Sequence, residues 1–204
     1  MLRMIRLLRF ILLMMFPFVA GAQAEEFDYK QMARELGISE LRAGVMLHGI
    51  ELTHGMPFVV ALTSFDYSKW QNLSAEILFD LPDNEMMRFL GSPRVSFGGT
   101  LNFVGHESML HLSANWKVPV FETGLFVEPF FGGAINSGYL HNAPPGHRVM
   151  GCRTMFYYGA NVGYQMTQST SVMMTYEHTS HNWLCGDDND GINRFGLRLG
   201  YLLD

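Results

Sequence analysis

Apolar and polar residues alternate with a period of two along most of the chain beyond residue 40. In about eight segments, every second residue is a large apolar one, and the residues between are polar, charged or glycine. Side chains of a β-strand point alternately to its two faces, so the pattern predicts strands with one apolar face. The predicted apolar faces include odd positions of 41–47 and 195–203 and even positions of 110–116 and 156–164.

The second face of these strands decides which kind of barrel we expect. Several glycines fall on it, together with a set of charged residues: Glu76, Arg94, Lys117, Glu128 and Arg198. Small and charged side chains suit the narrow interior of an eight-stranded barrel, where charges can pair, and large apolar side chains suit contact with lipid. We therefore predict an all-β fold, an eight-stranded antiparallel up-and-down transmembrane β-barrel over 41–204. Periodicity alone leaves a lipocalin-like periplasmic carrier, with the apolar face inside, as the alternative.

The segment before the predicted barrel divides into two parts. Residues 1–24 combine three arginines, an apolar run and the sequence Ala22-Gln23-Ala24, which is typical of a secretory signal with its cleavage site. A membrane anchor is the alternative, but Pro17 interrupts the apolar run. Residues 25–40 have one weakly apolar side at helical spacing, so we predict a short periplasmic helical segment there.

The composition agrees with an exported barrel and argues against a nucleic-acid-binding protein. The net charge of -5 gives no basic surface for nucleic acid, and the 21 glycines and 13% aromatic residues suit strands and turns. A signal segment followed by a transmembrane barrel predicts the bacterial outer membrane as the location.

Two cysteines occur in the chain, at positions 152 and 185. An even number of strands places both termini on the periplasmic side, so the loops after the fifth and seventh strands face outside. Cys152 lies in the first of these loops and Cys185 in the second. We predict a disulfide between them, because exported proteins fold in an oxidising compartment; two unpaired thiols are the alternative.

A histidine and a serine end the apolar row of the seventh strand. His178 and Ser180 have the same parity as Tyr176, and Asn193 has the apolar parity of the last strand. Because these two strands pair antiparallel, Asn193 is placed to lie beside His178. A serine and a histidine on one face suggest a nucleophile and its general base. The spacing alone is weak evidence, and rim residues that bind water and lipid headgroups are the alternative.

The stretch that contains these residues, EHTSHNWLCGDDNDGINRFGLRLGY, resembles the PagL-type lipid A 3-O-deacylases. That family has a strand ending in H-x-S-N, a loop, and N-x-G-[I/L] leading into the last strand. The upstream stretches SPRVSFGGTLN and FVEPFFGGAINSG are also similar to it, and the two cysteines match its longer secreted branch. The resemblance implies an outer-membrane barrel that hydrolyses an ester of lipid A in lipopolysaccharide. The chemistry of a histidine and serine pair implies no cofactor.

Carried over by position, Ser180 matches the nucleophile of that family and His178 its general base. Backbone N–H groups near His181 and Asn182 are then the expected oxyanion donors. The sequence departs from the family pattern at His181, where an Asn follows the serine.

The acid that orients the histidine in that family is replaced by Asn193, and the loop is one residue longer. An amide can orient an imidazole but cannot stabilise the imidazolium by charge. Asp188 or Asp190 is the alternative orienting group. A non-catalytic barrel that keeps the deacylase scaffold is therefore the second functional hypothesis.

We predict no metal site and interpret the acidic loop after residue 185 as solvated. A calcium site of another kind than the EF-hand, or a cation that bridges to lipopolysaccharide, is the alternative. The acidic loop after residue 185 does not match the calcium loop of an EF-hand, because Leu197 falls where the last ligand is required. The other histidines lack metal-ligand spacing and are expected to be rim or lumen residues: His48, His54, His106, His111, His141 and His147.

Overall fold

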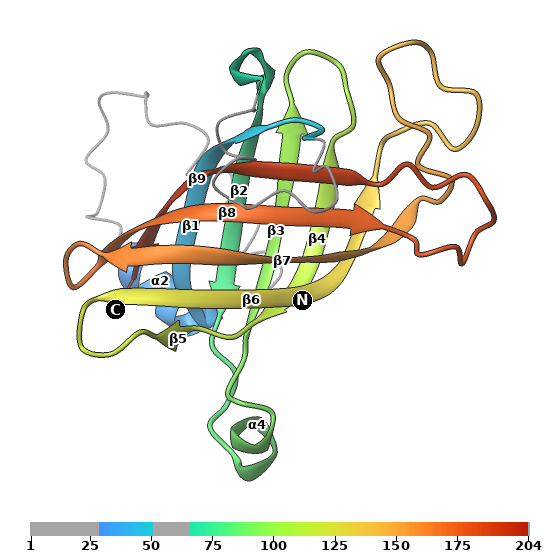
Figure 1. The fold of residues 1–204 in the computed structure, drawn as a ribbon. Helices are drawn as coiled ribbons and strands as arrows, with labels where there is room; N and C mark the ends of the chain where they lie inside the picture. Colours follow the sequence, from blue (N-terminus) through green and yellow to red (C-terminus); the bar gives the residue numbers. More distant parts are fainter. Residues whose placement is uncertain (1–28, 51–65, 204) are drawn as a thin grey trace, which may run out of the picture.

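The computed structural model describes residues 29–50 and 66–203 (Figure 1). The predicted signal segment 1–24 and His54 lie outside the described residues. No helix in the described part of the chain is long and apolar enough to cross a membrane.

The elements follow one another as a short helix and then mainly strands. In chain order they are α2 (Tyr29–Leu36), β1 (Ile38–Leu47), a 3₁₀ turn (Tyr67–Lys69), β2 (Trp70–Phe79), α4 (Glu85–Phe89), β3 (Arg94–Asn102), β4 (Met109–Asn115), β5 (Val118–Pro119), β6 (Leu125–Asn136), β7 (Thr154–Gln165), β8 (Thr170–Ser180) and β9 (Ile192–Leu202).

The strands close into the predicted barrel. Each long strand pairs antiparallel with its neighbours, β1 pairs with β9, and β4 pairs with β6. The eight strands β1 to β4 and β6 to β9 therefore form a ring without a free edge, and the two-residue β5 pairs with β6 only. This confirms the predicted all-β, eight-stranded up-and-down architecture.

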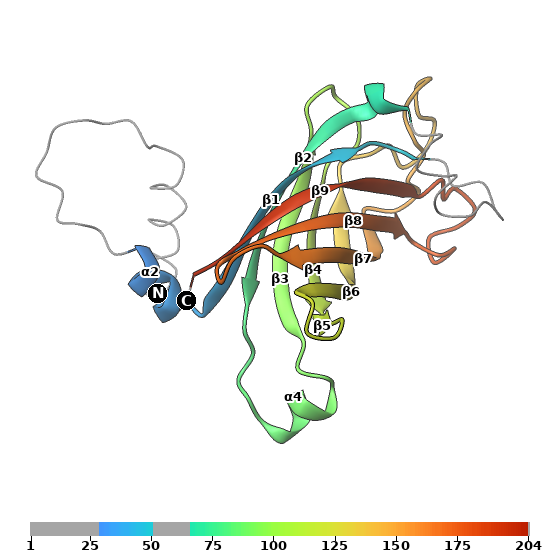
Figure 2. The same ribbon diagram turned by 60° about the vertical axis from the view of Figure 1, so that its left-hand side comes forward.

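The two ends of the barrel differ. Helix α2 and the end of β9 lie at one end, from which the β2–β3 connection with α4 also projects (Figures 1 and 2). Both termini of such barrels are periplasmic, so we call this the periplasmic end and the opposite one the outer end. The connections β1–β2, β3–β4, β6–β7 and β8–β9 lie at the outer end.

The first strand begins at Ile38 rather than at residue 41. Gly37, with a φ of 74°, follows the last helical residue and turns the chain in a left-handed conformation that glycine adopts without steric cost. Ile38 then pairs with Phe79 and packs with Ala33 of α2 and with Leu203. Helix α2 thus covers an apolar cluster at the periplasmic end.

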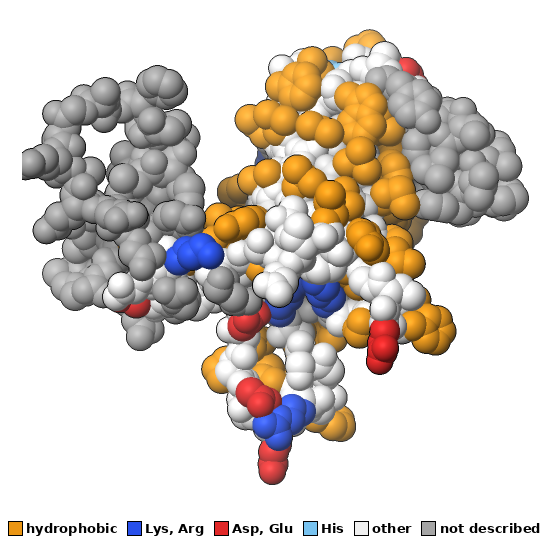
Figure 3. Space-filling model, turned by 90° about the vertical axis from the view of Figure 1, so that its left-hand side faces the viewer, with side chains coloured by type: hydrophobic (Ala, Val, Ile, Leu, Met, Phe, Trp, Pro, Cys, Tyr) orange, Lys and Arg blue, Asp and Glu red, His pale blue; other side chains and the backbone are white. Residues whose placement is uncertain are grey.

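The apolar face of the strands points outward. Leu101 is 61% exposed, Leu112 56% and Leu199 59%, whereas Glu76 and Arg198 are buried in the lumen. Figure 3 shows hydrophobic side chains over much of the wall of the barrel. The lipocalin-like alternative required the reverse arrangement, so the structure excludes it, and the outward apolar surface is the one a membrane barrel presents to lipid.

Three residues predicted to face lipid are buried instead. Leu203 packs under α2, and Leu47 and Phe195 form a cluster with Ile50, against which Trp70 and Tyr176 also pack. The alternation places their side chains as predicted, but it cannot show that segments outside the strands cover them.

Lys117 lies at the periplasmic rim of the lumen, over the buried side chain of Phe126. The residue follows the end of β4, where its Nζ donates to Gln165 Oε1 at 3.1 Å and lies 4.2 Å above the ring of Phe126.

Paired charges fill the middle of the lumen in two groups. Towards the periplasmic end, Arg94 donates to Glu40 and to Glu128 at 2.6 Å each, and Arg42 bonds the same two carboxylates. Further out, Arg198 lies 2.9 Å from Glu76 and 2.8 Å from Glu177. Buried charges are costly unless paired, so these contacts explain why the lumen face of the strands tolerates charge.

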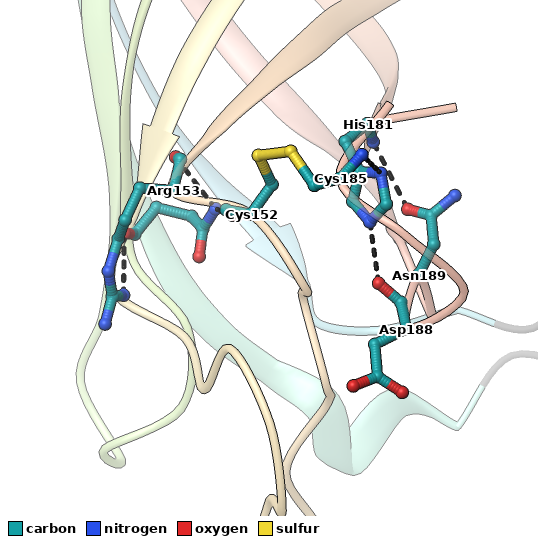
Figure 4. Close-up of a disulfide and its surroundings, with 7 residues drawn as sticks. Cys152, Arg153, His181, Cys185, Asp188 and Asn189 are labelled. Carbon is teal, nitrogen blue, oxygen red and sulfur yellow. Dashed lines mark hydrogen bonds between the residues drawn. A yellow bond between two sulfur atoms is a disulfide. The ribbon is translucent and has the colours of Figure 1, made fainter. Parts of the chain in front are cut away.

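The disulfide prediction is confirmed. Cys152 in the β6–β7 loop is bonded to Cys185 in the β8–β9 loop, with their Cα atoms 5.9 Å apart (Figure 4). The bond joins two outer loops that flank β7 and β8.

The outward orientation of the wall can be tested with a single spin label placed at either of two adjacent positions of β4. The only two cysteines are bonded to each other in the described chain, so a single added cysteine can be labelled alone. We expect a label at Leu112→Cys in lipid bilayers to collide often with oxygen, which concentrates in hydrocarbon. A label at the adjacent Ser113→Cys, which is 4% exposed in the lumen, should collide rarely. The reverse result would contradict the orientation.

Removal of the disulfide should weaken the fold without abolishing it. For the 33-residue separation, the loop-closure estimate gives a loss of about 3–4 kcal/mol in the free energy of unfolding of Cys152→Ser/Cys185→Ser. Urea unfolding in lipid bilayers measures this loss. A reductant should destabilise the wild type by the same amount and leave the double variant unchanged. If the reductant lowers the free energy of unfolding of both proteins equally, the disulfide is not the cause of the loss.

Candidate functional site

His178, Ser180 and Asn193 meet at the outer end of the wall between β8 and β9. His178 and Asn193 are directly paired residues of the two antiparallel strands, as their parity predicted. Ser180 is the last residue of β8 and shares the face of His178. All three are partly buried. The same face carries Met174, which is 43% exposed on the apolar wall, so the three polar groups lie directly above the surface that contacts lipid.

A hydrogen bond joins His178 to Asn193. The distance from His178 Nδ1 to Asn193 Oδ1 is 2.6 Å, and the Tyr176 hydroxyl donates to the same oxygen at 2.9 Å. The amide Nδ2 of Asn193 donates to the carbonyl of Ile50 at 3.2 Å. A carbonyl only accepts, so the amide nitrogen must face Ile50 and the amide oxygen must face His178.

This arrangement fixes the tautomer of His178. Because Asn193 Oδ1 is an acceptor, Nδ1 of the neutral ring carries the proton, and Nε2 is left with its lone pair. The ring of Tyr158 lies beside the imidazole, with the ring centroids 4.9 Å apart. The His178 ring is therefore held at its Nδ1, and its Nε2 finds no partner among the described residues.

Gly191 brings Ser180 and His178 together. A Cβ atom added to this glycine would lie 3.4 Å from both His178 Cε1 and Ser180 Cβ, so the two side chains flank one backbone position. The φ of Gly191 is 59°, a left-handed conformation that glycine adopts readily. The Ser180 hydroxyl makes no hydrogen bond to His178 or to any other described residue in this structure. Such contacts in enzymes often form only once substrate is bound.

His181 holds the β8–β9 loop. Its side chain is buried, its Nδ1 accepts from the Cys185 N–H at 3.3 Å, and its Nε2 therefore donates to the Asp188 carbonyl at 2.6 Å (Figure 4). The backbone N–H of His181 donates to Asn189 Oδ1 at 3.2 Å. This predicted oxyanion donor is thus already engaged within the loop.

Asn182 begins the exposed tip of the same loop. Asn182 and Trp183 both have left-handed backbones, with φ values of 48° and 66°. The Asn182 N–H finds no acceptor in the described part of the chain. Trp183 and Leu184, which follow, are 65% and 74% exposed. The loop next to Ser180 therefore offers the backbone N–H groups of Asn182 and Trp183, which have no acceptor among the described residues, and two apolar side chains.

Asp188 and Asp190, the alternative orienting groups, contact the β6–β7 loop and not His178. The Asp188 carboxylate contacts His141 Nδ1 at 2.7 Å, and the Asp190 carboxylate accepts from the Val149 N–H at 2.7 Å. Both partners belong to the β6–β7 loop, so these aspartates connect the two disulfide-linked loops. Within the described residues, Asn193 is the side chain that orients His178.

Sequence reasoning missed a cluster at the outer mouth of the lumen. His48, His106 and Glu107 lie together there, although 58 residues separate the two histidines in sequence. Glu107 Oε2 lies 3.0 Å from His48 Nε2, and Glu107 Oε1 accepts from the Arg148 N–H at 3.0 Å. The sequence held one sign of this cluster: the segment with His48 and the segment with His106 and Glu107 both fall at outer ends of predicted strands.

Comparison with known proteins bears on the family and on the fold. A family model described as lipid A 3-O-deacylase (PagL) matches residues 62–202. No curated protein matches the sequence. A crystal structure of the outer membrane enzyme PagL is similar over 80% of this chain and 99% of that chain, at 16% identity and a TM-score of 0.52. The N-terminal β-barrel domain of Pseudomonas aeruginosa OprF is similar over 81% and 97%, at 17% identity and a TM-score of 0.48.

At these identities the structural likeness shows the barrel fold alone. The family model carries more weight, because it covers more than half of the chain and includes the strands that hold His178, Ser180 and Asn193. An eight-stranded barrel of this family, with an apolar outer wall, is a protein of the bacterial outer membrane. The chain belongs to the PagL family of lipid A 3-O-deacylases.

Proposed function

We propose that this protein is an outer-membrane serine esterase that removes the 3-O-linked acyl chain of lipid A. The observation that carries the proposal is the 2.6 Å contact between His178 Nδ1 and Asn193 Oδ1, on the face that also carries Ser180. It leaves His178 Nε2 free to act as a base beside a serine, at the level of the membrane where lipid A esters lie.

The reaction would proceed in two steps. Ser180 Oγ attacks the ester carbonyl as His178 Nε2 takes the hydroxyl proton. The tetrahedral intermediate collapses, the sugar oxygen leaves with the proton from His178, and the acyl group stays on Ser180. Water, deprotonated by His178, then attacks the acyl-enzyme, and Ser180 regains its proton as the fatty acid leaves. No cofactor enters either step.

Asn193 can orient the histidine although it lacks charge. In a serine protease, the change of the triad acid to Asn costs about 10⁴-fold in turnover because it favours the wrong histidine tautomer. Here the Ile50 carbonyl holds the amide nitrogen of Asn193, so the amide oxygen faces His178 and the correct tautomer is kept. Only the electrostatic stabilisation of the imidazolium is lost.

We assign the oxyanion contact to the backbone N–H of Asn182. Of the two predicted donors, His181 donates to Asn189 and holds the loop, whereas Asn182 follows at the turn and finds no acceptor in the described chain. Exposed Trp183 and Leu184 beside it are suited to contact acyl chains.

The second candidate is a non-catalytic barrel that keeps the scaffold of the family. The specific observation in its favour is the amide of Asn193 where the family has an acid. The same contacts around His178 would then be structural only, and the protein would leave lipid A unchanged.

Loss of the nucleophile separates the two candidates. We expect Ser180→Ala to reduce deacylation by about 10³-fold or more, and His178→Gln to do nearly the same, because the serine is a weak nucleophile without its base. Mass spectrometry of lipid A from cells with and without the protein measures the loss of one acyl chain. Ser171→Ala, on the same strand at its periplasmic end, is the matched control and should retain activity. If the wild type is inactive, the non-catalytic barrel is the remaining candidate.

The orienting position gives a sharper test. We expect Asn193→Glu to raise turnover, because a carboxylate would stabilise the imidazolium, and Asn193→Leu to lower turnover by about 10²- to 10⁴-fold. Initial rates on lipid A in mixed micelles measure both effects. Asp190→Asn should change little, since its carboxylate bonds the Val149 N–H. If Asp190→Asn abolishes activity and Asn193→Glu changes nothing, the loop aspartate is the third member of the triad.

A further inference from the structure

The cluster at the outer mouth of the lumen has the composition of a metal site. His48 follows β1, and His106 and Glu107 lie between β3 and β4. One ligand atom from each of these residues lies within 4.8 Å of the other two. His147, from the β6–β7 loop, stands beside them with its Nδ1 3.5 Å from Glu107 Oε1. Three outer loops thus converge on one carboxylate.

The carboxylate of Glu107 is deeply buried. Its residue is 2% exposed, Oε1 accepts from the Arg148 N–H at 3.0 Å, and Oε2 lies 3.0 Å from His48 Nε2. A buried carboxylate requires a compensating cation or several hydrogen bonds. The backbone N–H groups of Arg148 and of Glu107 itself are neutral donors and supply only part of that compensation, so the partner at Oε2 matters.

The hydrogen bonds of Asn72 show whether the neutral His48 ring directs a proton or a lone pair toward Glu107. The Asn72 amide nitrogen donates to the Met46 carbonyl at 3.2 Å, and its Oδ1 accepts from Asn102 at 3.0 Å. The same Oδ1 lies 3.3 Å from His48 Nδ1, so Nδ1 carries a proton. In a neutral ring, Nε2 then presents a lone pair to a carboxylate oxygen. Two acceptors at 3.0 Å need a cation between them, either a proton or a metal ion.

His106 favours the metal over the proton. Its Nδ1 is shielded from solvent and finds no hydrogen-bond partner among the described residues. Its ring stacks on His48 at 5.0 Å between centroids and lies 4.8 Å from that of His147. Additional protons on these rings would place positive charges in contact. A metal ion instead uses the lone pairs of the rings, and with His106 Nδ1 as its ligand atom it would also give that nitrogen a partner.

We propose that His48, His106 and Glu107 bind a divalent transition-metal ion, with Zn²⁺ as the best match. Imidazole and carboxylate ligands suit zinc, whereas calcium and magnesium prefer all-oxygen sites. Ligand atoms around a tetrahedral zinc lie about 3.3 Å apart, so separations of up to 4.8 Å must shorten by up to about 1.5 Å, which side-chain rotations can supply. Asn72 serves as the outer partner that orients the His48 ring. The expectation of no metal is revised accordingly.

The position of the site indicates its role. His48 lies two residues before Ile50, whose carbonyl orients Asn193, and the Glu107 carbonyl accepts from Arg194 at 3.0 Å. A metal here would tie the β1–β2 and β3–β4 connections together directly behind the His178–Asn193 pair. This role rests on the proposed function, but binding of the metal does not.

Metal binding can be measured without any activity assay. The untagged full-length protein is refolded in detergent, treated with a chelator and titrated with Zn²⁺ by calorimetry, with metal analysis after dialysis. We expect one Zn²⁺ per chain with a Kd of about 1 μM or below, no comparable binding of Ca²⁺, and affinity at least about 100-fold weaker in His48→Gln, His106→Gln or Glu107→Gln.

A matched control comes from the exposed pair His141 and Asp188, which are 2.7 Å apart in the same loop region. His141→Gln should bind Zn²⁺ like the wild type. Because a ligand variant could fail to fold, Co²⁺ is also added to the wild type, where absorption bands of a tetrahedral nitrogen and oxygen site are expected. Absence of stoichiometric Zn²⁺ binding and of these bands would overturn the proposal and leave a protonated His48 paired with Glu107. An inactive esterase that binds zinc would refute the proposed function alone.

Discussion

The compensation of charge inside the lumen is the constraint on which the rest of the structure depends. Arg198 contacts both Glu76 and Glu177, which come from β2 and β8 on either side of β1 and β9. Removal of one partner would leave a buried charge without compensation, which commonly costs about 3–5 kcal/mol. The interior therefore couples distant strands of the ring and keeps their register, including the pairing of His178 with Asn193.

Above this rigid interior, the outer loops are fastened to one another at several points. The disulfide, the Asp190 contact to Val149 and the packing of Gly151 against Asp188 all join the same two loops. A Cβ atom at Gly151 would lie 1.8 Å from the Asp188 carbonyl oxygen, so no larger residue fits there without displacement. The loop that follows Ser180 is thereby anchored by contacts that do not involve the candidate site itself.

Most of the fold could be predicted from the sequence, because alternation of side chains is a local property of each strand. The ring of eight strands, the outward apolar face and the Cys152–Cys185 bond all followed from it. The predictions that were wrong concern features set by segments outside the strands, such as the burial of Leu203 under helix α2. For the candidate site, parity placed Asn193 beside His178. The role of Ile50 and the convergence of His48 with Glu107 depend on loop paths that carry no periodic signal.

The location of His178 and Ser180 on the outside of the wall has a kinetic consequence for a protein of this family. A substrate would reach them by lateral diffusion within the leaflet and not through the aqueous phase. The rate of such an enzyme depends on the number of substrate molecules per unit area of membrane. Dilution of the substrate with inert lipid would slow it at constant bulk concentration, and the packing of neighbouring lipids would set how often an ester comes into reach.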